Sequence, residues 1–223
     1  TPLQHDEDSL RYVMAQLEEI IVQLQRIFAT TLKTGKLEES VANAEKARRA
    51  MLKVNELRLD PDCPFTAQEA FNHLYLYFTG LGSEAMPRIY ETLAQELAEK
   101  IEAAGEPKKT PRYKLLWLHL PPFYRNNLLA YLQEKKAKVV FEEFSHVYWG
   151  EMDPNKPLLA IAKRMLSHFS YGHINRRVKV IKELAQRYEV DGVIYFSHWG
   201  CRQSCGGLKI IRDALQKEGL PFL

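Results

Sequence analysis

The sequence predicts an α/β protein in which a helical N-terminal half is followed by a doubly wound parallel sheet. In the first hundred residues, apolar side chains recur every three or four positions with charged residues opposite, as in amphipathic helices. After the segment GEPKKTPR at 105–112, short apolar runs alternate with helical patterns, which indicates right-handed crossovers and a parallel sheet. We therefore expect a helical segment over 1–110 and an α/β domain over 111–223, truncated at its C-terminal end.

Composition narrows the class of protein. The 223 residues are 46% hydrophobic and 26% charged, as in an ordinary soluble globular protein. The net charge of +3 is mild and basic residues alternate with acids, so we expect no nucleic-acid partner. No apolar run is long enough to cross a bilayer, and the N-terminus lacks the pattern of a signal peptide.

Cysteine usage and the chain ends add two expectations. An odd number of cysteines without a secretory signal argues against a disulfide framework and favours a reducing, cytoplasmic location. The first residue is not Met, and the last five, GLPFL, resemble the opening of a strand. We expect a fragment of a longer polypeptide.

Four helices are expected in the N-terminal half. The first ends near Gly35 and carries an apolar stripe that forms core or a subunit interface: Leu10, Val13, Met14, Leu17, Ile20, Ile21, Leu24, Ile27 and Phe28. The second spans about 38–57 and ends before the proline-rich LDPDCPF. Thr66 and Glu69 form a capping-box pattern for the third, which ends near Gly80. Its predicted inward side chains are Phe71, Leu74, Tyr75 and Phe78. The fourth spans about 83–104.

In the second half, strands are expected at 113–119, 138–143 and 190–197, with a fourth opening at the C-terminus. Helices are expected at 123–135, 158–169, 174–188 and 208–218. Ligands of open parallel sheets bind beyond the carboxyl ends of the strands, so the loops after the three strands are the candidate site.

The loop after the third strand, SHWGCRQSCGG at 197–207, holds the densest set of reactive side chains. A thiolate near the start of the helix expected at 208 would be stabilised by backbone amides and the helix dipole. Glycines allow the backbone to approach a bulky anionic group. Such a site suits an iron–sulfur cluster. From the residues alone, two other interpretations stay open: a buried structural cysteine, and a nucleophilic cysteine with His198 as its base.

The stretch VDGVIYFSHWGCRQSCGG at 190–207, followed by LKIIRDALQKEGLPFL, resembles the 2-hydroxyacyl-CoA dehydratase D-component family, which includes benzoyl-CoA reductase subunits. The segments PRYKLLWLHLPP and KVVFEEF resemble the family's first two strands, in the same order. The expected architecture is therefore a helical half packed on a flavodoxin-like α/β half.

The resemblance implies a subunit of an oxygen-sensitive lyase. Family subunits hold a [4Fe-4S] cluster through three cysteines, and an ATP-dependent iron–sulfur activator injects one electron. In the dehydratases this electron drives elimination of water from an (R)-2-hydroxyacyl-CoA. The implied partners are a second dehydratase subunit, the activator and an acyl-CoA, with no nucleic acid and no membrane. Alternatives are a benzoyl-CoA reductase-type or double-cubane reductase subunit, an electron-relay subunit and a cluster-free binding module.

The resemblance also assigns residues. Cys201 matches the family's last cluster cysteine, and the other two ligands are expected before Thr1. Cys205 is either a bystander or an additional metal ligand, as in double-cubane proteins, whereas Cys63 is interpreted as structural. The remaining candidates are His198 and Gln203 for catalysis, and Ser197, Trp199, Gly206 and Gly207 for cofactor binding, with Trp199 shielding the cluster.

Several other polar residues have two possible roles each. Glu142 and Glu143 either share a proton or are solvated charges at a strand end. Arg176 and Arg177 either reach CoA phosphates or lie in a solvated helix start. Tyr148, Trp149 and Asp153 either line a pocket or pack as aromatic core.

Overall fold

The computed structural model describes residues 6–104 and 111–223. The predicted boundary at 105–112 falls largely outside the described residues, so the division into two domains stays a prediction. The N-terminal half consists of α1 (Glu7–Ile27), α2 (Lys36–Leu57), α3 (Ala67–Gly80) and α4 (Ala85–Glu102). The second half consists of β1 (Tyr113–Leu118), α5 (Leu128–Glu134), β2 (Ala137–Glu142), the 3-10 turn η1 (Glu143–Ser145), α6 (Pro157–Ser167), α7 (Ile174–Arg187), β3 (Gly192–Tyr195) and α8 (Arg202–Gln216).

The sheet has the order β2-β1-β3 with parallel pairing, and Phe222 adds a parallel bridge to Val193 on the far side of β3. The Tyr195 amide donates to the Leu223 carbonyl at 2.8 Å. The C-terminal residues therefore run parallel beside β3, where the sequence predicts the opening of a fourth strand. The resulting order 2-1-3, continued by the C-terminal segment, is that of flavodoxin-like sheets.

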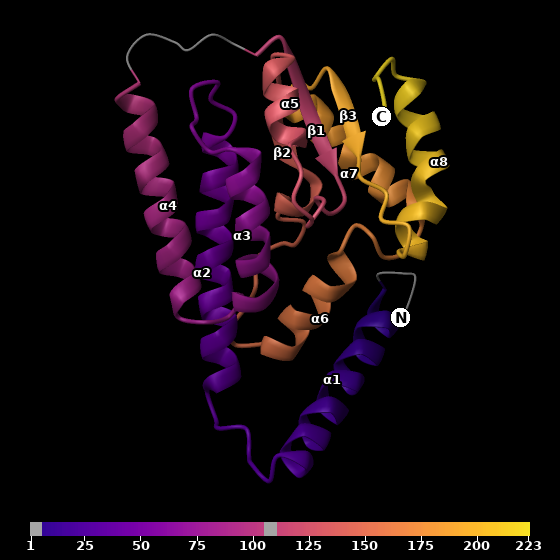
Figure 1. The fold of residues 1–223 in the computed structure, drawn as a ribbon. Coiled ribbons are helices and arrows are strands. Elements are labelled where there is room, and N and C mark those ends of the chain that lie inside the picture. The colour runs from indigo at the N-terminus through magenta and orange to yellow at the C-terminus, as the bar shows by residue number, and fades with distance from the viewer. Residues whose placement is uncertain (1–5, 105–110) are drawn as a thin grey trace.

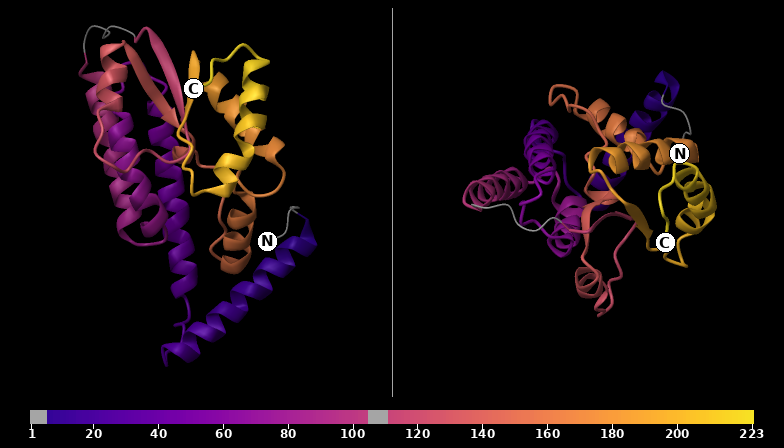
Figure 2. Two further views of the ribbon diagram at one scale, coloured as in Figure 1. Left: turned by 45° about the vertical axis from the view of Figure 1, so that its right-hand side comes forward. Right: turned by 90° about the horizontal axis from the view of Figure 1, so that it is seen from above.

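Helices cover both faces of this sheet (Figure 1). On one face, Trp117, Val139 and Ile194 pack with α5 and with Phe71 of α3. The other face packs against α7 and α8 through Leu116, Phe141, Val193, Ile181 and Ile211. Figure 2 shows α5 on one side of the strands and α7 and α8 on the other. The α/β, doubly wound prediction is confirmed.

Capping residues explain where several helices begin. The Thr66 hydroxyl accepts from the Glu69 amide at 3.2 Å, and the Glu69 carboxylate accepts from the Thr66 amide at 2.7 Å. The predicted capping box is therefore confirmed. Gly35, predicted to end the first helix, is instead the N-cap of α2 with φ +82°, and α1 ends at Ile27.

Two helices in the second half begin five or six positions from their predicted starts. Helix α5 begins at Leu128 rather than Phe123, because the Asn126 side chain bonds the Leu128 amide (3.0 Å) and the Tyr124 carbonyl (2.8 Å) and holds this segment in a turn. Helix α8 begins at Arg202, six positions before the predicted start.

Two predicted inward side chains of α3 point elsewhere. Phe71, Leu74 and Tyr77 form its buried stripe, whereas Tyr75 is 72% exposed and Phe78 is 52% exposed. Both choices satisfy three-four spacing, so only the packing partner decides which residues face inward.

The apolar stripe of α1 is divided. Its N-terminal part packs on α6, where Val13 contacts a cluster with Ala162 and Leu166. Its C-terminal part, including Ile20, Leu24, Ile27 and Phe28, is exposed. Figure 1 shows this end of α1 leading away from the rest of the chain. Within the described residues, no helix combines the length and apolar character needed to cross a membrane.

The two halves meet at a buried ion pair. Arg58 is the residue directly after α2. Its guanidinium contacts the Glu142 carboxylate through Nη1–Oε2 (2.8 Å) and Nη2–Oε1 (2.9 Å). The exposed fraction is 3% for the Arg58 side chain and 2% for the Glu142 side chain. Arg58 also donates to the Val140 carbonyl at 3.0 Å. The interpretation of Glu142 as a solvated strand-end charge is therefore wrong.

Substituting Arg58→Ala is expected to lower the free energy of unfolding by about 3–5 kcal/mol, because it leaves the Glu142 carboxylate buried without a counter-charge. Guanidinium-induced unfolding followed by tryptophan fluorescence measures the change. The matched control is Lys179→Ala, which removes an exposed ion pair to Glu183 and is expected to cost less than about 1 kcal/mol. Equal effects of the two substitutions would contradict a structural role for the buried pair.

Candidate metal centre at the carboxyl edge of the sheet

The candidate site lies where β1 and β3 end side by side. The register pairs Leu118 with Tyr195, so both strands finish at the same level. The chain leaves β1 toward α5 on one face and leaves β3 toward α8 on the other. Adjacent strands whose connections part in this way form the switch point at which open α/β sheets bind ligands.

Cys201 caps the helix that follows β3. Its amide donates to the His198 carbonyl at 2.9 Å, and its own carbonyl accepts from the Cys205 amide at 3.0 Å, the first hydrogen bond of α8. The residue is partly exposed. The next three amides, of residues 202–204, have no acceptor within the helix, so they give this end a partial positive charge.

Cys205 lies one helical turn further on and is exposed. Its Sγ atom is 3.5 Å from the Ser197 hydroxyl and 3.5 Å from the His198 carbonyl. The structure therefore brings Ser197 and Cys205 together, although eight positions separate them. Cys201 is the N-cap of α8 and Cys205 lies in the first turns of the helix, four positions later.

The other predicted loop residues occupy different environments. His198 is exposed and Trp199 is 90% exposed, so the indole covers no described part of the chain. The Gln203 amide donates to the Ser170 carbonyl, which joins α8 to the segment after α6. Whether these side chains act on a substrate or a cluster stays a prediction.

The two glycines differ in what surrounds them. Gly207 is buried, and a Cβ atom there would lie 2.8 Å from Ile174 Cδ1, at the start of α7. Gly206 is exposed, with nothing within 4 Å of such an atom. Gly207 therefore allows α8 to approach α7, and the predicted cofactor-binding role of both glycines remains untested.

The thiols supply only part of a ligand set. Among the described residues, no group of three or more His, Cys, Asp or Glu side chains is arranged to hold a metal ion. A cubane needs about four ligands. Cys201 and Cys205 fit as one or two of them, on a helix start that favours anionic sulfur. Cys63 is buried, and burial raises the pKa of its thiol, as suits a structural cysteine.

Arg177 and Glu143 have internal roles that the sequence did not reveal. The guanidinium contacts both Glu143 oxygens at 2.6 Å, and both side chains are buried. Arg176 donates to the carbonyls of Leu166 and Ser167 at the end of α6. The expectations of CoA-phosphate contacts or a solvated helix start are wrong for Arg177, as is the solvated-charge interpretation of Glu143.

Two ring side chains, Trp149 in the second loop and His119 directly after β1, are buried. Trp149 is buried and packs on Tyr77 and Tyr148, as expected of aromatic core. The sequence predicts His119 as the last residue of the first strand. In the structure its imidazole is buried and stacks on Tyr195 with centroids 6.0 Å apart, and its backbone φ is +67°. Burial and the nearby Arg177 charge lower its pKa. Its place between β1 and two prolines was the only sequence signal.

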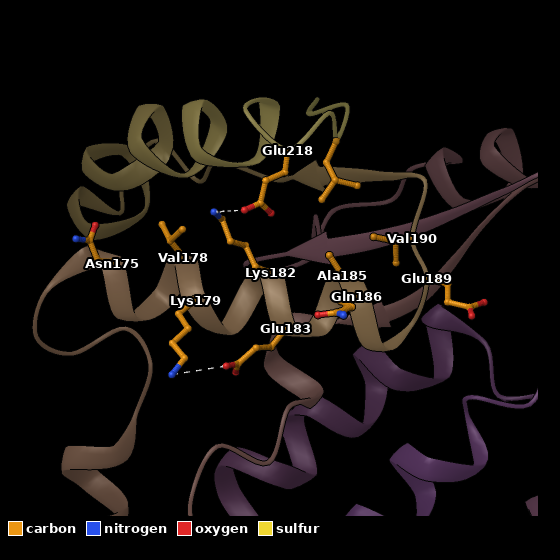
Figure 3. A pocket seen from close by; sticks show the side chains of 11 residues that line it. Asn175, Val178, Lys179, Lys182, Glu183, Ala185, Gln186, Glu189, Val190 and Glu218 are labelled. Carbon is orange, nitrogen blue, oxygen red and sulfur yellow. Dashed lines mark hydrogen bonds and ion pairs between the residues drawn. The ribbon is translucent and has the colours of Figure 1, made fainter.

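Two concave surfaces differ in their relation to this site. A groove of about 690 Å³ follows α7, where Lys182 pairs with Glu218 and Lys179 with Glu183 (Figure 3). None of its lining residues comes from the cysteine loop. A cavity of about 510 Å³ lies beside the end of β1, lined by Trp117, Phe123, Tyr124 and Asn126. Phe196, which directly precedes the loop at 197–207, stacks on Trp117, so this second cavity adjoins the candidate site.

These features define a flavodoxin-like α/β fold with two thiols beyond the carboxyl edge of its sheet. The family model described as "2-hydroxyglutaryl-CoA dehydratase, D-component" matches residues 1–223, and the chain belongs to this family. The resemblance found in the sequence is therefore confirmed.

Three curated relatives illustrate the family. The chain is 22% identical to the (R)-phenyllactyl-CoA dehydratase alpha subunit of Clostridium sporogenes, over 97% of the chain and 53% of that protein. It is 24% identical to a benzoyl-CoA reductase subunit of Thauera aromatica, over 94% and 52%. It is 28% identical to the (R)-2-hydroxyglutaryl-CoA dehydratase alpha subunit of Acidaminococcus fermentans, over 44% and 20%. The chain spans about half the length of the relatives that it matches most fully.

The two glycines permit a test of their packing roles. Gly206→Ala is expected to raise the free energy of unfolding by about 0.5–1 kcal/mol, because alanine has the higher helix propensity and open space surrounds the new Cβ. Gly207→Ala is expected to show none of this gain, since Ile174 must move to admit the methyl group. Thermal unfolding compares the variants. A larger gain at Gly207 would contradict close packing of α8 on α7.

Proposed function

We propose that this chain is part of a subunit of an iron–sulfur 2-hydroxyacyl-CoA dehydratase, and that Cys201 is one ligand of its [4Fe-4S] cluster. The observation that carries the proposal is the position of Cys201, at the start of α8 and at the switch point of the sheet, in a chain of this family. The remaining ligands would lie outside this chain. The proposed location is cytoplasmic.

When bound, such a cluster would supply a single electron to the substrate thioester, received from an ATP-dependent iron–sulfur activator. The proposed substrate is an (R)-2-hydroxyacyl-CoA that loses water, and a second dehydratase subunit would complete the enzyme. This half of the subunit would then contribute a ligand, the electrostatic environment around it and the polar rim beside it.

The residues of the loop suit these tasks. The free amides at the start of α8 stabilise negative charge on sulfur. The exposed His198 imidazole would protonate a leaving hydroxyl. The Gln203 side chain donates its amide hydrogen to Ser170, which leaves its oxygen as an acceptor for a substrate hydroxyl. Ser197 and Gly206 border the Cys205 thiol, and Trp199 would shield the cluster once a partner covers the loop.

A second candidate function is that of a benzoyl-CoA reductase-type subunit, favoured by the similarity to the benzoyl-CoA reductase subunit of Thauera aromatica. In that case the same thiol would serve transfer of electrons to an aromatic ring. A double-cubane reductase subunit, a relay subunit and a cluster-free binding module complete the candidate functions. Assays of the activated complex with an (R)-2-hydroxyacyl-CoA and with benzoyl-CoA separate dehydration from ring reduction.

Substituting Cys201→Ser in the full-length polypeptide that contains this chain is expected to abolish the [4Fe-4S] signal or reduce it severely, because hydroxyl oxygen is a poor cluster ligand. Anaerobic reconstitution with iron and sulfide, followed by visible absorption and electron paramagnetic resonance, measures the cluster. Cys205→Ser is the matched control, one turn away on the same helix, and is expected to retain the signal.

Two results would oppose the proposal. An unsubstituted protein that assembles no cluster would leave only the cluster-free binding module. A Cys201→Ser variant with a full signal, beside a Cys205→Ser variant without one, would move the ligand to Cys205.

A further inference from the structure

A chain of buried polar contacts runs beneath the cysteine loop. The Glu143 carboxylate binds the Arg177 guanidinium through Nε and Nη2, both at 2.6 Å. Arg177 Nη1 donates to the Tyr195 hydroxyl at 3.2 Å. The Tyr195 hydroxyl donates to the Ser204 carbonyl at 3.0 Å and lies 3.1 Å from the Ser204 hydroxyl. The contacts therefore connect the end of β2, through α7 and β3, to the first turn of α8.

All four residues of this chain are buried. Relative exposure is 0% for Glu143, 3% for Arg177, 7% for Tyr195 and 1% for Ser204. Burial opposes the charge of Arg177, but the hydrogen bonds and charge of Glu143 outweigh it and raise the pKa of Arg177. Because buried polar groups without partners are costly, each member constrains the next one.

The Tyr195 hydroxyl is the contact that reaches the loop. Tyr195 is the last residue of β3, and Ser204 lies in the first turn of α8, three positions after Cys201. Between them, residues 198–200 are exposed and contribute little packing. The hydroxyl thus ties the end of the strand to the turn that carries both thiols.

The ring of Tyr195 is itself held in place. It stacks on the His119 imidazole with centroids 6.0 Å apart and an interplanar angle of 11°. The His119 amide donates to the Glu143 carboxylate at 3.1 Å, so β1 joins the same arrangement. Removing only the hydroxyl would leave this ring packing intact.

We propose that Tyr195 is a positioning residue for the cluster-ligating turn: its hydroxyl fixes the first turn of α8, and thereby Cys201, relative to the sheet. The part of this inference that concerns the cluster rests on the proposed function. The part that concerns α8 does not, because it depends only on contacts within the chain.

The test is Tyr195→Phe, which keeps the ring and removes the hydroxyl. Amide hydrogen exchange in the full-length apoprotein is expected to accelerate about tenfold over residues 205–208, since one buried hydrogen-bonded link is lost. In the anaerobically reconstituted protein, the reduction potential and the paramagnetic line shape of the cluster are expected to change.

Tyr188→Phe is the matched control. Tyr188 is also a buried tyrosine of the same half, and its hydroxyl donates to the Asn55 carbonyl at 2.9 Å rather than to α8. Exchange over 205–208 and the cluster signal are expected to stay as in the unsubstituted protein. Ser204→Ala, which keeps the carbonyl acceptor, is expected to give a smaller acceleration, and it replaces Tyr195→Phe if that variant does not fold.

The outcomes distinguish the two parts. Unchanged exchange in Tyr195→Phe, or equal acceleration in Tyr188→Phe, overturns the role of the hydroxyl in holding α8. Faster exchange with an unaltered potential and line shape overturns its role in positioning the ligand. An unsubstituted protein without a cluster overturns the proposed function, while hydrogen exchange still decides whether Tyr195 holds the helix.

Discussion

Two consecutive carboxylates at the end of β2 organise this chain, because each is buried against a different arginine. Glu142 pairs with Arg58 at the end of α2, and Glu143 pairs with Arg177 in α7. Glu142 is the last residue of β2 and Glu143 is the first residue of η1, and their side chains reach two separate elements. Burying either charge alone would be strongly unfavourable, which makes both arginines necessary. The helical half and the covering helix α7 are thereby joined to the same strand end.

The site depends on this arrangement. The Glu143–Arg177 pair supports Tyr195, and Tyr195 contacts the turn of α8 that begins at Cys201. The loop itself is short of internal support, since residues 198–200 are exposed. A loop that presents a thiol beyond the edge of the sheet stays exposed, so its conformation depends on contacts with the buried residues beneath it. The buried polar chain provides that constraint.

Several large apolar side chains of the chain are exposed to solvent. Trp199, the C-terminal part of the α1 stripe, and Tyr75 and Phe78 of α3 all leave large apolar side chains in solvent. The chain belongs to a family whose relatives are named as subunits of dehydratases and of a reductase, and it spans about half of the relatives that it matches most fully. These exposed apolar surfaces are consistent with the proposed assembly, in which a second subunit would cover them.

The sequence by itself determined the order of helices and strands, the Thr66–Glu69 capping box and the delivery of Cys201 by β3, because these depend on local periodicity and neighbouring side chains. Tertiary structure alone decided which of Leu74 and Tyr75 faces inward, since both satisfy helical spacing. It also decided that α8 begins at Arg202: glycines in its first two turns suggested a loop, yet Gly207 packs on Ile174 and Tyr195 binds Ser204. The partners Glu143 and Arg177 are separated by 34 positions, and only the folded chain brings such distant charges together in its buried interior.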